Sequence, residues 1–294
     1  MFNNNTRTKK LQLTSETIKL RQLSVTDADI AKTAGGHPVT GGAPDVLDVV
    51  GLSTAHICTW NGGHLIKVTR NRTVNTGGGG ARGKITGFSK NSRRRLMRTI
   101  AKTKKVQLPI FVTLTYPGQW DNNPKKWKRD LRVFWMRLNR ALPGVGCIWK
   151  LEFQKRGAPH FHLLVWGSGY APLLINVSRI WYETVGSGDE RHLRAGSRVE
   201  MVKSWRGVMA YASKYLGKVE LLPVTEPGRF WGVMAEENLP WADMVQMALT
   251  DRQACQFLRL MRRMAHLRGR AYNSLTIFTD ADFWVDRLDR LLDI

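Results

Sequence analysis

Two histidines and a glutamate lie close together in a segment with the pattern of two paired strands. His160 and His162 are separated by one residue, so on a strand both side chains point to the same face of a sheet. A glycine and a proline just before them are typical of a tight reversal. A hairpin folded there, with strands over 147–154 and 160–166, brings Glu152 opposite the histidines. Two imidazoles and a carboxylate on one face predict a divalent-metal site.

A second group of side chains suited to chemistry lies downstream, in the segment YASKYLGK. Tyr211 and Tyr215 are four residues apart, so on a helix they share a face. Lys214 and Lys218 each follow one tyrosine by three residues. A phenol is a poor nucleophile near neutral pH unless its developing charge is stabilised and its electrophile is polarised. A lysine and a metal ion that grips a phosphate would supply both effects, which favours transesterification of a phosphodiester.

The charge of the chain indicates a polyanionic partner. The 294 residues include 46 Lys and Arg against 23 Asp and Glu, a formal net charge of +23. Residues 82–140 hold 17 basic residues and two acidic ones, a density that exceeds what solubility requires and suits the phosphates of DNA or RNA. No apolar run approaches the length of a spanning helix, so we expect no membrane partner. The predicted phosphate contacts are Arg93, Arg94, Arg95, Arg98, Lys125 and Lys126.

Other features exclude several classes of protein. The three cysteines are odd in number and widely separated, which argues against a disulfide framework or a CxxC zinc site. With an N-terminus that lacks a signal-peptide core, they predict a cytoplasmic protein. The run GGGARGK over 78–84 matches a P-loop in part, but Ile85 stands where magnesium needs Ser or Thr, so an NTPase is not expected.

Periodicity and turn residues predict the remaining elements. Strands are predicted over 109–116, 198–203 and 274–279, and a hairpin over 57–69. Helices are predicted over 89–105, 124–141, 173–184, 205–216, 241–268 and 282–292. Residues 189–196 are predicted to form a charged loop, and most of residues 1–50 to be mobile.

Three segments, in the order FVTLTYP, PHFHLLV and YASKYLGK, resemble the motifs of HUH endonucleases, specifically rolling-circle replication initiators of single-stranded DNA phages, plasmids and small circular-genome viruses. The resemblance spans about residues 88–235 and includes the runs SKNSRRRLMR and GRFWGV. It implies an α+β fold with a central antiparallel sheet of about five strands, related to ferredoxin and RRM topologies, flanked by helices and followed by extra C-terminal helices. We predict an accessory region over 1–80, the endonuclease domain over 81–235 and a mainly helical extension over 236–294.

The resemblance also implies the cofactor and the partners. The metal would be Mg²⁺ or Mn²⁺, held by Glu152, His160 and His162. The substrate would be single-stranded DNA at a replication origin, which can include a hairpin. Because no helicase motif is present, a host helicase or a separate helicase is expected to open the duplex, in the cytoplasm of a bacterial host.

The two-tyrosine form of the third motif implies a nicking and rejoining reaction. One tyrosine would form a 5′-phosphotyrosine link and release a free 3′-OH, and the other would act when the circle is closed. Lys214 fits the YxxK pattern of the resemblance and favours Tyr211 as the first nucleophile, although Tyr215 with Lys218 fits the same pattern.

Two alternatives remain open at this point. A two-tyrosine transposase shares the order of the motifs. A basic replication regulator that binds nucleic acid without nuclease activity would keep the charge and the fold, and it would bind DNA in a salt-sensitive way without cleaving it.

Overall fold

A computed structural model of the chain describes residues 55–61, 65–70, 85, 87–217, 226–264 and 274–278. The segment 1–50, predicted to be mobile, and the helix predicted over 282–292 lie outside the described residues. Within the described ranges, no helix has both the length and the apolar character needed to cross a membrane.

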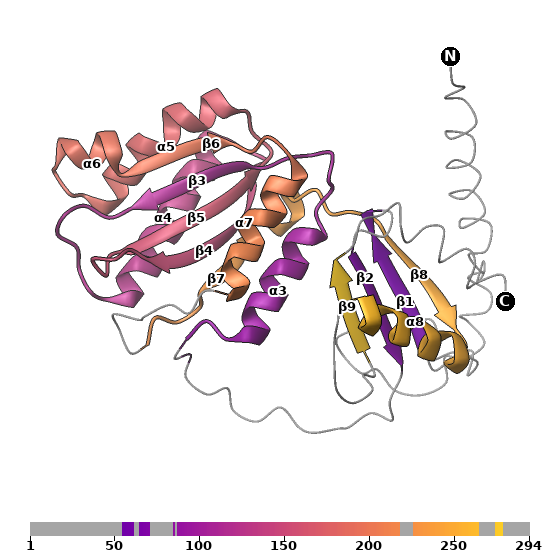
Figure 1. The fold of residues 1–294 in the computed structure, drawn as a ribbon. Helices are drawn as coiled ribbons and strands as arrows, with labels where there is room; N and C mark the ends of the chain where they lie inside the picture. The colour runs from indigo at the N-terminus through magenta and orange to yellow at the C-terminus, as the bar shows by residue number, and fades with distance from the viewer. Residues whose placement is uncertain are drawn as a thin grey trace, which may run out of the picture.

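The described elements alternate between strands and helices along the chain (Figure 1). The strands are β1 (Ala55–Trp60), β2 (Leu65–Arg70), β3 (Ile110–Thr115), β4 (Gly146–Phe153), β5 (Pro159–Trp166), β6 (Ser197–Met201), β7 (Trp231–Met234), β8 (Met244–Leu249) and β9 (Ser274–Phe278). The helices are α3 (Lys90–Ala101), α4 (Pro124–Ala141), α5 (Tyr170–Val185), α6 (Glu190–Ala195), α7 (Trp205–Gly217) and α8 (Asp251–Met264), with a short 3₁₀ helix at Glu236–Asn238.

The larger sheet has five strands in the order β6-β3-β5-β4-β7, and every neighbouring pair is antiparallel. This confirms the predicted α+β class with a central antiparallel sheet flanked by helices. β4 and β5 form the predicted hairpin. At its turn Arg156 donates hydrogen bonds to the carbonyl oxygens of Tyr116 at 2.6 Å and Pro117 at 2.8 Å, which ties the hairpin to the end of β3.

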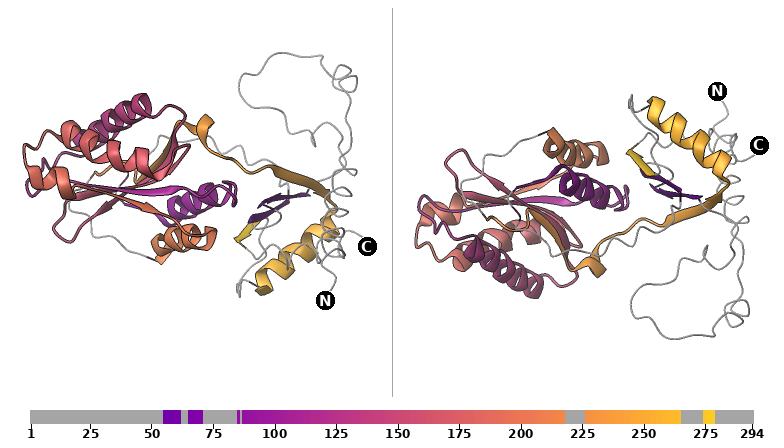
Figure 2. Two further views of the ribbon diagram at one scale, coloured as in Figure 1. Left: turned by 90° about the horizontal axis from the view of Figure 1, so that it is seen from above. Right: turned by 90° about the horizontal axis from the view of Figure 1, so that it is seen from below.

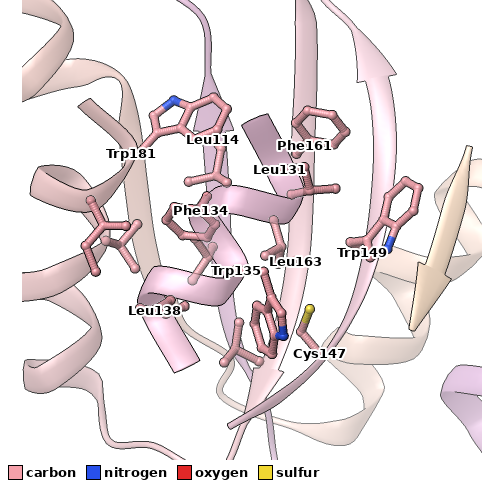
Figure 3. Packing of buried hydrophobic residues seen from close by; sticks show 14 of the residues in the cluster. Leu114, Leu131, Phe134, Trp135, Leu138, Cys147, Trp149, Phe161, Leu163 and Trp181 are labelled. Atoms are coloured by element: carbon pink, nitrogen blue, oxygen red, sulfur yellow. The ribbon is translucent and has the colours of Figure 1, made fainter. Parts of the chain in front are cut away.

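Helices cover both faces of this sheet, as Figure 1 and Figure 2 show. On one face α4 and α5 pack over strand residues such as Leu163, with Phe134 and Trp181 fully buried (Figure 3). On the other face α3 and α7 pack over a smaller apolar cluster that includes Ile148 and Leu164. Side chains alternate along a strand, so the even-numbered residues of β4 and β5 face α3 and α7. The predicted metal ligands are among them.

A second, four-stranded sheet joins regions far apart in the sequence, in the order β8-β1-β2-β9. Pairing of β1 with β2 confirms the hairpin predicted over 57–69. Ile57, Val68, Phe257 and Met261 form a core between one face of this sheet and α8. Strands from the predicted accessory region and from the predicted C-terminal extension thus share one sheet, and the domain boundaries at residues 80 and 235 stay predictions.

Two predicted elements are wrong. The long helix expected over 241–268 begins only at Asp251, because Met244–Leu249 is strand β8. The sequence MVQMAL is rich in helix formers, but ladder pairing with β1 outweighs that local preference. The charged loop expected over 189–196 contains α6, which Asp189 caps by accepting a hydrogen bond from the Arg191 backbone N–H at 2.9 Å.

Two glycines beside the metal-ligand hairpin offer a matched test of backbone packing. Gly144 and Gly167 both have φ of +85°, but a Cβ at Gly144 would meet nothing within 4 Å, whereas a Cβ at Gly167 would collide with the Gly144 carbonyl oxygen. We expect Gly144→Ala to lower the free energy of unfolding by about 1–2 kcal/mol, the cost of the left-handed backbone alone. Gly167→Ala should cost about 2–4 kcal/mol, because the backbone must also move. Urea unfolding measures both, and equal losses would contradict the packing described.

Candidate active site

The three predicted metal ligands lie on one face of the larger sheet. Glu152 of β4 pairs with His160 of β5, which is the register that the sequence predicted. His162 Nε2 lies 2.9 Å from Glu152 Oε2, and the ring centroids of His160 and His162 are 4.4 Å apart. Glu152 is buried and both histidines are half-buried. The predicted grouping is therefore present, on the face beneath α3 and α7.

His162 has a second polar neighbour that the sequence reasoning missed. Its Nδ1 lies 3.2 Å from the hydroxyl of Thr113, which is the β3 residue paired with His162 in the sheet. When Nε2 carries the proton and donates to Glu152, the threonine hydroxyl donates to Nδ1. Because a hydroxyl can also accept, Thr113 equally supports the tautomer in which Nε2 keeps a lone pair for a metal ion.

His160 has the electrostatics expected of a metal ligand. Its Nε2 is buried and has no hydrogen-bond partner among the described residues. Burial lowers the pKa of His160 to about 4, assisted by repulsion from His162, Lys150 and Arg156. At neutral pH the ring is therefore uncharged and retains a lone pair. A buried nitrogen without a partner is costly, and a bound cation would offset that cost.

The fit to a divalent ion is partial in the arrangement observed. In the described parts of the chain, no three His, Cys, Asp or Glu side chains are placed to hold an ion together. Two of the predicted ligands are: neighbouring ligands of an octahedral Mg²⁺ at about 2.1 Å lie about 3 Å apart, close to the 2.9 Å between His162 Nε2 and Glu152 Oε2. His160 lies beside this pair without completing it. The donor types, this spacing and the orphaned Nε2 of His160 fit a hard divalent ion.

A buried lysine also borders the site. Lys150 pairs with His162 in the β4–β5 register and is only 3% exposed. Its Nζ donates to the Leu151 carbonyl oxygen at 3.1 Å and lies 5.2 Å from the centroid of the Phe88 ring. Strand alternation places Lys150 on the same face as Glu152, two residues further on, so the sequence held a signal for it. This cation gives the site a positive character.

Helix α7 brings one of the predicted tyrosines to the same face. The half-buried Tyr211 ring packs edge-on against Phe111, with 4.5 Å between centroids, and lies 6.0 Å from the His162 ring. Phe111 in turn stacks on His162 at 5.4 Å. Tyr215 and Lys214 also belong to α7, but their side chains lie outside what the structure describes, as does Lys218 entirely.

The predicted phosphate contacts divide between the two faces of the larger sheet. The four arginines belong to α3, on the side of the histidines, whereas Lys125 and Lys126 begin α4 on the opposite side (Figure 2). Lys126 is engaged with the buried Asp130 at 3.0 Å. Arg93 donates to the Phe88 carbonyl oxygen at 2.9 Å, while Arg94 and Arg95 are exposed. The six residues therefore do not form one surface.

Comparison with known proteins points to the same segment. Residues 109–220, which contain the histidine pair and both tyrosines, match a family model of the replication-associated proteins, of the ORF2 type. The matched class is that of replication initiators. Among individual proteins, the chain is similar to a replication-associated protein of Pseudomonas phage Pf3, with 26% identity over 212 residues that cover 67% of this chain and 74% of the phage protein.

Proposed function

We propose that this protein initiates rolling-circle replication as a two-tyrosine HUH endonuclease, nicking and rejoining single-stranded DNA at an origin. The observation that carries the proposal is the placement of Tyr211 beside His162, with 6.0 Å between their rings, next to the Glu152–His162 pair. Similarity to replication-associated proteins supports the biological process. The net charge of +23 supports a nucleic-acid substrate.

The proposed reaction exchanges one phosphodiester for another. The phenolic oxygen of Tyr211 or Tyr215 attacks the scissile phosphorus and gives up its proton to water. As the new O–P bond forms, the bond from phosphorus to the 3′ oxygen breaks, and that oxygen takes up a proton to become a free 3′-OH. The 5′-phosphate stays on the tyrosine. Attack by a 3′-OH on the phosphotyrosine reverses these steps and closes the strand, so no external energy source is required.

The residues of the site have distinct proposed roles. Glu152, His160 and His162 would hold Mg²⁺ or Mn²⁺, which when bound draws negative charge from the phosphate oxygens. Lys214 or Lys218 would stabilise the phenolate of the attacking tyrosine by its charge. The packing of Tyr211 against Phe111 limits where the phenol can lie, which positions it for attack.

Thr113 is expected to matter through His162. Thr113→Val removes the hydroxyl that contacts His162 Nδ1 and leaves the shape of the side chain nearly unchanged. We expect Mn²⁺ affinity, measured by electron paramagnetic resonance, to fall by about tenfold or more. Thr113→Ser retains the hydroxyl and should restore most of the affinity. If Val and Ser variants bind Mn²⁺ equally well, the hydroxyl does not orient His162.

The proposal is tested by covalent capture. The full chain is incubated with Mn²⁺ and single-stranded DNA that carries the matching origin, and the products are separated on a denaturing gel. The proposed function predicts a protein–DNA adduct that requires the metal and disappears with chelator. A non-catalytic replication regulator would bind the same DNA and give no adduct with either, and that result would exclude nicking.

A further inference from the structure

A basic cavity lies between α3 and the four-stranded sheet, away from the histidines. Its volume is about 510 Å³. Arg95, Arg98 and Lys102 of α3 line one side, and Lys67 of β2 lies on the opposite side, within the sheet. We call this cavity the interlobe groove. Its size is in the range of sites that bind small ligands or short segments of a polymer.

The groove follows from the alternation of the two hairpin strands. Ile57 and Val68 point to α8 and form the core of the small lobe. The intervening residues, such as Cys58 and Lys67, point to the other face, toward α3. The sequence therefore makes one face of this sheet apolar and buried and leaves the other polar and basic.

Hydrogen bonds hold the two sides of the groove in register. Asn61, directly after β1, donates from Nδ2 to the carbonyl oxygens of Ala101 at 3.0 Å and Thr103 at 2.9 Å, at the end of α3. The Ala242 backbone N–H, just before β8, donates to the Lys102 carbonyl oxygen at 2.7 Å. A site with both walls fixed in this way costs little ordering when a ligand enters.

Charge in the groove is unbalanced. Four of its lining side chains are Lys or Arg, and no Asp or Glu belongs to the described lining. Burial, and then repulsion from Lys67 and Arg98, lowers the pKa of Lys102. Elsewhere in the described chain, comparable cations have carboxylate partners, such as Lys126 with Asp130 at 3.0 Å. Cations placed together in this way favour an anion between them.

Aromatic side chains accompany the cations. Lys102 Nζ lies over the Trp60 ring, 4.7 Å from its centroid. The half-buried Trp231 also lines the groove, and its Nε1 donates to Ser92 Oγ at 2.9 Å, which fixes the ring. Basic side chains next to a fixed indole are the combination that binds single strands, since the cations hold phosphates and the ring stacks on a base.

We propose that the interlobe groove binds a short stretch of single-stranded DNA, with Lys67, Arg95, Arg98 and Lys102 on its phosphates. The inference rests on the proposed function for its choice of DNA over other polyanions. It adds a second contact for the substrate strand, built by the small lobe and α3, to the one at the metal-ligand face. The predicted contacts Arg95 and Arg98 belong to this groove.

The test measures the salt dependence of binding, which reports the number of phosphates neutralised. The full chain is titrated with a fluorescein-labelled single-stranded oligonucleotide in chelator, so that no nicking occurs, over a range of salt concentrations. For the Lys67→Ala, Arg98→Ala variant we expect the slope of log K against log salt to become shallower by about 1.4. The matched control, Arg132→Ala with Arg140→Ala, removes two exposed arginines of α4 and should keep the wild-type slope.

A charge-preserving variant separates charge from packing. Lys67→Arg with Arg98→Lys should keep the wild-type slope, and a loss equal to that of the alanine pair would overturn the proposal. An alanine-pair slope equal to that of the α4 control would overturn it as well. Because this readout needs no cleavage, it is independent of the adduct assay: a wild-type chain that forms no adduct counts against the nickase, whereas an unchanged slope counts against the groove.

Discussion

Replacing both tyrosines of α7, in the Tyr211→Phe, Tyr215→Phe variant, is expected to abolish the covalent DNA adduct. The phenolic oxygen is the atom that attacks phosphorus, and phenylalanine keeps the ring that packs on Phe111. We expect adduct formation to fall by at least about 10³-fold on a denaturing gel. Tyr170→Phe, on the exposed surface of α5, is the matched control and should form the adduct at the wild-type rate.

The single variants assign the two tyrosines. If Tyr211 attacks first, Tyr211→Phe loses most of the initial adduct, and Tyr215→Phe keeps it but fails to close the circle. The reverse pattern would make Tyr215 the first nucleophile. A double variant that still forms the adduct would show that neither tyrosine is the nucleophile.

Glu152→Gln is expected to have the second large effect. The substitution keeps the size of the side chain and a hydrogen bond to His162, but it removes the negative charge that a divalent ion requires. We expect both Mn²⁺ affinity and the rate of adduct formation to fall by about a hundredfold. Electron paramagnetic resonance measures the first and the denaturing gel the second.

The matched control for this change is Glu183→Gln. Glu183 lies on α5, where it is exposed and pairs with Arg179 at 3.6 Å, so its loss should affect neither quantity. Unchanged Mn²⁺ affinity in Glu152→Gln would remove Glu152 from the metal site and leave its contact with His162 as a structural one.

The hairpin of the site was predictable because its signals are local. Strand alternation, a turn and the spacing of the histidines place Glu152 opposite His160, and the β4–β5 register has that pairing. Lys150 was within reach of the same reasoning, since it shares the face of Glu152. Thr113 was not, because its contact with His162 depends on the pairing of β3 with β5, and strand partners distant in sequence leave no local mark.

The small lobe was beyond sequence reasoning for the same cause. β1 and β2 precede the larger sheet in the chain and β8 and β9 follow it, so only the folded structure brings them together. The residues of β8 favour a helix locally, which led to the wrong prediction over 241–268. The interlobe groove depends on that sheet, and so the two arginines of α3 that line it were predicted as phosphate contacts without their opposite wall.

The most direct test of the central claim is to identify the residue attached to DNA. After incubation with Mn²⁺ and origin DNA, the adduct is digested with nuclease and protease, and the modified peptide is sequenced by mass spectrometry. The account predicts a nucleotide joined through its 5′-phosphate to Tyr211 or Tyr215. A link to any other residue, or through a 3′-phosphate, would contradict it.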